Sequence, residues 1–68
     1  MKISARNQLK AKITKITTGA VNTEVQLDLG GQSVTAVITN ASAQSLGLVV
    51  GKPAYAIIKA SSIMIGVD

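Results

Sequence analysis

The sequence predicts an all-β fold, a five-stranded Greek-key barrel with one short helix between the third and fourth strands. Apolar and polar residues alternate strictly from residue 21 to 29, a pattern typical of a half-buried strand. The Gly30-Gly31 pair follows, and alternation resumes from 33 to 39, so these residues predict a β-hairpin. The chain has 68 residues, which limits it to one domain.

The first strand is predicted upstream of this hairpin. Leu9, Ala11 and Ile13 alternate with polar residues, as the apolar face of a strand does. Ile16 falls out of that register, and we therefore expect a bulge or strong bend near Lys15. The small and polar residues from 17 to 20 predict the turn into the second strand.

The second half of the chain contains the helix and two further strands. Asn40 is expected to cap a short helix over residues 41–46, which Gly47 ends. The last two strands are predicted over residues 54–59 and 63–67, separated from the helix by a turn at Gly51-Lys52-Pro53. The resulting order, β-β-β-α-β-β, is typical of an OB-type Greek-key barrel.

The fourth and fifth predicted strands are apolar on both faces. A barrel interior takes only alternate residues of a strand, so the other face needs a second cover. The chain has no cysteine for a disulfide and lacks the Cys and His ligands of a structural zinc site. We therefore expect the protein to be a homo-oligomer.

The composition excludes most enzyme chemistry. The chain has no histidine and no cysteine, and its serines lack an activating partner. Glu24 and Asp28 lie four residues apart on one predicted strand, more than ~13 Å from end to end, too far for a catalytic pair. We therefore predict no enzyme activity, no catalytic residues and no side chains that ligate a metal directly.

Two short segments near the ends of the chain instead favour oxyanion binding. Each places one long cation beside small or hydroxyl residues, and an ionised oxyanion requires such charged, hydroxyl and backbone N–H donors. These segments and the exit of the third strand are expected to converge only where subunits meet. The candidate donors are the cations Arg6 and Lys59, the hydroxyl groups of Ser4, Thr39, Ser42, Ser61 and Ser62, and the backbone N–H groups of Ala5, Ala60 and Ser61.

The alternative function is an OB-type nucleic-acid-binding module. The net charge of +4 is compatible with either function, because a positive field attracts any anion. Single-stranded nucleic acid also requires aromatic side chains on which bases stack, and Tyr55 is the only aromatic residue. We therefore expect no nucleic-acid partner. The apolar runs are too short to span a bilayer and no secretory apolar region follows Met1, so we also expect a cytoplasmic protein without membrane contact.

Four stretches of the chain resemble the molbindins, small bacterial molybdate-binding proteins of the Mop type. They are residues 1–9, 19–25, 42–51 and 56–64, and the first and last are the most specific. Similar domains form the C-terminal parts of the molybdate-responsive transcription regulator and of the molybdate importer's ATPase. The resemblance implies a single Mop domain over residues 1–68.

The resemblance also implies a ligand and an assembly. It implies molybdate, with tungstate as a substitute, bound at subunit interfaces of a hexamer arranged as a trimer of dimers. The motif matches imply that residues 4–6 and 59–61 bind the anion. Thr39 and Ser42 match the positions at which the family's chain enters its helix, and the resemblance implies the same role for them. The sequence indicates one Mop unit without a DNA-binding or ATPase part, and we therefore expect a role in intracellular molybdenum storage and homeostasis.

Overall fold

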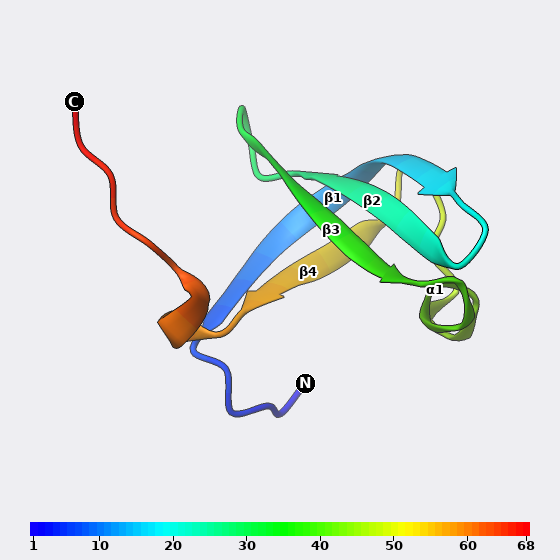
Figure 1. Ribbon diagram of the computed structural model, residues 1–68, viewed down its shortest axis with the longest axis horizontal. Helices are drawn as coiled ribbons and strands as arrows, with labels where there is room; N and C mark the ends of the chain where they lie inside the picture. The colour runs from blue at the N-terminus through cyan, green and yellow to red at the C-terminus, as the bar shows by residue number, and fades with distance from the viewer.

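The protein is a curled antiparallel sheet with one short helix at one end (Figure 1). The computed structural model describes residues 1–68. The sheet order is β3-β2-β1-β4, so β3 and β4 form its two edges. The elements are β1 (Asn7–Thr18), β2 (Asn22–Asp28), β3 (Ser33–Thr39), α1 (Asn40–Leu46), β4 (Pro53–Ile58) and the 3-10 turn η1 (Ala60–Ser62).

Strand β1 carries the predicted bulge. Its pairing with β2 shifts between Ile13 and Lys15, and Ile16 then lies opposite Val25. The extra residue at this point restores the alternation, so that Ile16 lies on the same inner face as Ile13. The bulge also bends the strand, and β1 pairs with β4 through its first half and with β2 through its second.

The β2–β3 hairpin turns at the predicted glycine pair. Gly30 and Gly31 have φ values of 93° and 107°, a backbone region that other residues rarely adopt. The carboxylate of Asp28 accepts hydrogen bonds from both glycine N–H groups, at 3.3 Å and 3.2 Å. This turn sets the register in which Val25 pairs with Ala36 on the inner face of the sheet.

Helix α1 ends at Gly47 as predicted, but its N-cap is Thr39 and not Asn40. The Thr39 hydroxyl accepts a hydrogen bond from the Ser42 N–H at 3.1 Å. The Asn40 side chain is occupied elsewhere: it donates to the carbonyl of Gly19 at 3.0 Å and accepts from the Thr23 hydroxyl at 2.6 Å. The buried Thr23 hydroxyl therefore has a hydrogen-bond partner. With seven residues, α1 is too short to span a bilayer as a helix.

The expectation of a fifth strand is wrong, because the structure has four. Residues Ile63–Asp68, which we call the tail, run away from the sheet after η1 (Figure 1). Met64, Ile65 and Val67 are 91%, 88% and 92% exposed. A strand requires a hydrogen-bonded neighbour, and η1 directs the tail away from both sheet edges. The apolar pattern of the tail therefore has no partner within its own chain.

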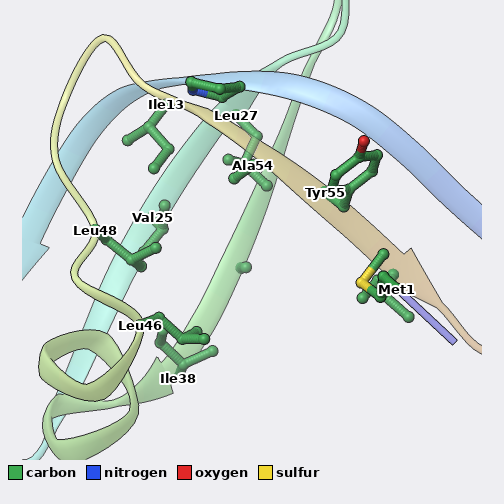
Figure 2. A pocket seen from close by; sticks show the side chains of 12 residues that line it. Met1, Ile13, Val25, Leu27, Ile38, Leu46, Leu48, Ala54 and Tyr55 are labelled. Carbon is green, nitrogen blue, oxygen red and sulfur yellow. The ribbon is translucent and has the colours of Figure 1, made fainter. Parts of the chain in front are cut away.

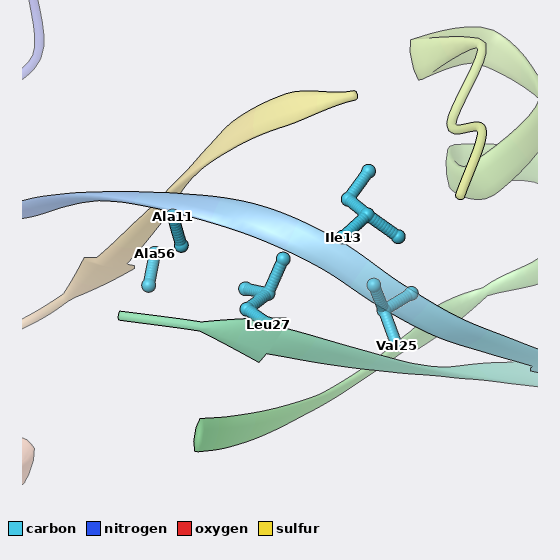
Figure 3. Close-up of a cluster of buried hydrophobic side chains, with 5 residues drawn as sticks. All are labelled: Ala11, Ile13, Val25, Leu27 and Ala56. Atoms are coloured by element: carbon cyan, nitrogen blue, oxygen red, sulfur yellow. The ribbon is translucent and has the colours of Figure 1, made fainter. Parts of the chain in front are cut away.

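The hydrophobic core is small and lies on the inner face where β1 crosses β2 and β4. Figure 3 shows Ala11 beside Ala56, with Ile13 on β1 and Val25 and Leu27 on β2. Only six of the 68 residues are buried, the sixth being Thr23. A core of this size gives a single chain little hydrophobic stabilisation.

Candidate functional site

The structure gathers six of the nine predicted donor residues around one cavity at the end of the sheet. This end cavity has a volume of about 600 Å³. The chain enters β1 and leaves β4 side by side, next to η1 (Figure 1), and residues from these two segments line the cavity. Its lining residues are Ser4, Ala5, Arg6, Ile57, Lys59, Ala60 and Ser61.

The pairing of β1 with β4 creates this cavity. The two strands are antiparallel and Asn7 lies opposite Ile58, so the residues before β1 meet those after β4. The Gln8 side chain donates a hydrogen bond from Nε2 to the Ala5 carbonyl at 2.7 Å, which links the N-terminal segment to the first residues of β1. The two end segments therefore converge within one chain, whereas the exit of the third strand, which was expected to join them only where subunits meet, does not join them within the chain.

The cavity is rich in donors of positive or neutral character. Arg6 and Lys59 bring two cations, and Ser4 and Ser61 bring two hydroxyl groups. No Asp or Glu lines the cavity. A guanidinium group offers several planar donors and an ammonium group offers a compact charge, so together they suit a small anion with several acceptor oxygens.

Thr39 and Ser42 do not join the six candidates of the end cavity within the chain, and Ser62, the last residue of η1, does not line the cavity either. They lie at the start of α1, at the opposite end of the sheet from η1 (Figure 1). The 12-residue length of β1 separates the two regions, since Thr39 pairs with Asn22 beyond the far end of β1. The Thr39 hydroxyl caps the helix and donates to the Ser42 hydroxyl at 2.9 Å.

Ile57 lines the end cavity, although sequence reasoning did not include it. A weak signal for it exists, because Ile57 and Lys59 are two residues apart and side chains two apart lie on the same side of an extended chain. Its half-exposed side chain forms an apolar wall beside the cationic groups.

A second cavity, with a volume of about 360 Å³, lies between the two edge strands. We call it the seam, because β3 contributes Ala36 and Ile38 to its lining and β4 contributes Ala54, Tyr55 and Ile57. Eleven of its 12 lining residues are hydrophobic, so it offers almost nothing to a charged ligand. Figure 2 shows its extent, with the side chains of Leu46 and Ile38 near α1 and those of Tyr55 and Met1 at the other end.

The acidic residues lie apart from both cavities. Glu24 and Asp28 are on β2 and point to the outer face of the sheet, the side opposite the core. The chain has no group of three or more His, Cys, Asp or Glu side chains that could hold a metal ion.

Comparison with known proteins agrees with this architecture. The TOBE domain model matches residues 3–65. A protein of Haemophilus influenzae named "Probable molybdenum-pterin-binding protein" is 54% identical over 69 residues, with all of both chains covered. A molybdate-binding protein of Sporomusa ovata has a TM-score of 0.91 at 37% identity, covering 96% of this chain and 97% of that one.

A third relative has its ligand in place. ModG, described as a cytoplasmic molybdate-binding protein and solved with molybdate bound, has a TM-score of 0.91 at 43% identity. The match covers all of this chain and 49% of ModG. The fold is thus the OB-like fold of these neighbours, formed here with four strands. The chain belongs to the TOBE domain family and to the molbindins, the small Mop-type proteins that its two end segments resemble.

Proposed function

We propose that this protein binds molybdate in the end cavity, with tungstate as a substitute, and serves intracellular molybdenum storage and homeostasis. The observation that carries the proposal is the set of donors in that cavity: two cations and two hydroxyl groups with no carboxylate among them. Charge-assisted hydrogen bonds to an oxyanion are the strongest that such groups form. The molybdate-bound relative supports the choice of anion, and its description as cytoplasmic supports the same compartment for this protein.

The donors have distinct roles in this proposal. Arg6 and Lys59 supply the charge that a dianion requires, and the serine hydroxyls of Ser4 and Ser61 supply neutral donors. The small side chains of Ala5 and Ala60 let the backbone N–H groups approach the ligand. Thr39 and Ser42 reach this ligand only from another copy of the chain, since their own chain holds them at the far end of the sheet.

The linings of the two cavities favour the bare oxyanion over a pterin, which the names of several relatives include. A pterin ring requires an aromatic or flat apolar surface together with several in-plane hydrogen-bond partners. The end cavity has the polar groups but no aromatic residue, and the seam has Tyr55 but almost no polar groups. Neither cavity combines both features, whereas the end cavity alone suits an oxyanion.

The nucleic-acid alternative lacks a stacking surface. Tyr55 is half exposed and lies opposite Lys10, so one base could stack beside one cation. A single-stranded nucleic acid normally uses several such platforms along a basic groove. Salt distinguishes the two functions, because the affinity of an oligonucleotide held by charge alone falls steeply as the salt concentration rises.

The proposal includes assembly as a homo-oligomer, with a hexamer built as a trimer of dimers. Three features support it: the small core, the apolar seam between β3 and β4, and the exposed apolar tail. A strand added to the seam would pair with the free edges of both strands and cover its apolar lining. The tail of a second copy has the length and the apolar alternation for this position.

Calorimetry with four anions tests the proposed function. We expect strong binding of molybdate and tungstate, because the two dianions share shape, charge and size. Sulfate is smaller, so the same donors cannot close on it. Phosphate carries a proton at neutral pH, and a site without acceptors has no partner for it. Equal affinities for sulfate and molybdate would contradict the proposal, and so would binding that requires an oligonucleotide.

A further inference from the structure

We propose that the tail sets the oxyanion affinity of the end cavity through η1, so that Ile63 and Ile65 are positioning residues for a ligand they do not touch. This inference rests on the proposed function and on assembly through the seam. The end cavity and the tail are otherwise separate features, one polar and the other apolar. They are joined by the three residues of η1.

The first step is the hydrogen bonding of η1. The turn is held by two backbone bonds, from Ser62 N–H to the Lys59 carbonyl at 2.8 Å and from Ile63 N–H to the Ala60 carbonyl at 3.3 Å. Both acceptors belong to residues that line the end cavity. The donor of the second bond is the first residue of the tail. The direction in which the tail leaves therefore affects the bond that orients Ala60.

The second step is that the free chain holds this turn weakly. Residues of η1 are not buried, and the turn has no side-chain cap. A turn fixed by two backbone bonds in water is readily opened, since exposed local structure has little stability of its own. Three of the seven lining residues, Lys59, Ala60 and Ser61, lie at this turn, so the cavity is not fixed for binding until something else fixes η1.

The third step is the tail. Side chains two apart share one side of an extended chain, so Ile63, Ile65 and Val67 form one apolar edge. Burying that edge in the seam of a second copy fixes the chain that follows Ser62. The Ile63 N–H then stays directed at Ala60, and the ligand binds a cavity that is already ordered.

The coupling must act in both directions. If tail insertion raises the affinity for molybdate by some factor, bound molybdate strengthens tail insertion by the same factor. We expect a factor of at least ten. We also expect molybdate to slow hydrogen exchange at the amides of residues 64–67, although none of them lines the cavity.

The experiment separates the tail from the turn without removing either. Two glycines inserted between Ser62 and Ile63 keep the tail and all seven residues that line the end cavity, but let η1 and the tail move independently. The matched control inserts two glycines between Gly30 and Gly31, in a hairpin turn that lines neither the end cavity nor the seam. Native mass spectrometry reports the oligomer, calorimetry the molybdate Kd, and hydrogen exchange the tail.

The expected result is a Kd at least tenfold weaker for the first insertion, with loss of the molybdate effect on tail exchange, and no change for the control. An unchanged Kd in the first insertion overturns the coupling. The coupling is also overturned if molybdate does not alter hydrogen exchange in the tail of the natural protein. That measurement needs no variant. Absence of molybdate binding by the natural protein would instead overturn the proposed function, and this inference with it.

Discussion

Arg6 is the residue whose replacement tests the end cavity most directly. Its guanidinium offers several planar donors, and it lines the end cavity together with Lys59. We expect Arg6→Ala to weaken molybdate binding by about 1.5–3 kcal/mol, roughly 10- to 150-fold in Kd. Calorimetry on natural and variant proteins at one protein concentration measures the difference.

Two further variants make the Arg6 result specific. Arg6→Lys keeps the charge but loses the planar donors, so its Kd should lie between those of the natural protein and Arg6→Ala. Lys12→Ala removes a cation from the outer face, away from the end cavity, and should leave the Kd almost unchanged. Equal losses in Arg6→Ala and Lys12→Ala would mean that net charge, and not this cavity, attracts the anion.

Ile13 is the residue on which the small core depends most. Its side chain is 1% exposed and lies beside Leu27 on the inner face. We expect Ile13→Ala to lower the free energy of unfolding by about 2–5 kcal/mol through lost burial and the cavity it leaves. Val37 is 65% exposed on the outer face, so Val37→Ala should change the free energy of unfolding by less than about 0.5 kcal/mol. Denaturant unfolding of both variants gives the comparison.

At the scale of elements, helix α1 depends on its cap. The Thr39 hydroxyl accepts the Ser42 N–H and has no equivalent in an alanine. Thr39→Ala should lower the free energy of unfolding by about 1 kcal/mol, whereas Thr39→Ser should keep most of the stability because it keeps the hydroxyl. Thermal unfolding of the two variants measures this. Equal stabilities would show that the hydroxyl does not stabilise the helix.

Local signals in the sequence predicted four strands and the helix because their causes are local. The out-of-register Ile16 indicated the β1 bulge, and Gly30-Gly31 indicated the hairpin whose φ values only glycine adopts readily. The N-cap was misassigned, since both Thr39 and Asn40 are good caps. Only the tertiary bonds of Asn40 to Gly19 and Thr23 decide between them.

The fifth strand was mispredicted because its cause is not local. Alternation in the tail indicates a preference for a sheet, but not which chain provides that sheet. The end cavity was likewise predictable only in part. Residue types identified Arg6 and Lys59, and the β1–β4 pairing then brought them together. That pairing also added Ile57 and left Thr39 at the far end, which residue types alone could not indicate.

At the scale of the whole molecule, the balance of burial and exposure favours the oligomer as the folding unit. Six residues are buried, while the seam and the tail leave large apolar side chains in contact with water. Neither a disulfide nor a cluster of metal ligands supplements this core. Chains of this size usually need such a supplement, and the proposed association of the apolar surfaces would provide one.

The melting temperature should therefore rise with protein concentration, because dilution favours separated chains that are poorly stable. Molybdate at a hundredfold excess over its Kd should add about 2.7 kcal/mol per site, since it binds only the folded form. Calorimetric melts across a range of protein concentrations, with and without molybdate, measure both effects, and native mass spectrometry identifies the species present. A melting temperature independent of concentration, together with a monomer that binds one anion, would contradict the assembly. The cavity of a single chain would then have to supply every donor, and Thr39 and Ser42 would have no part in binding.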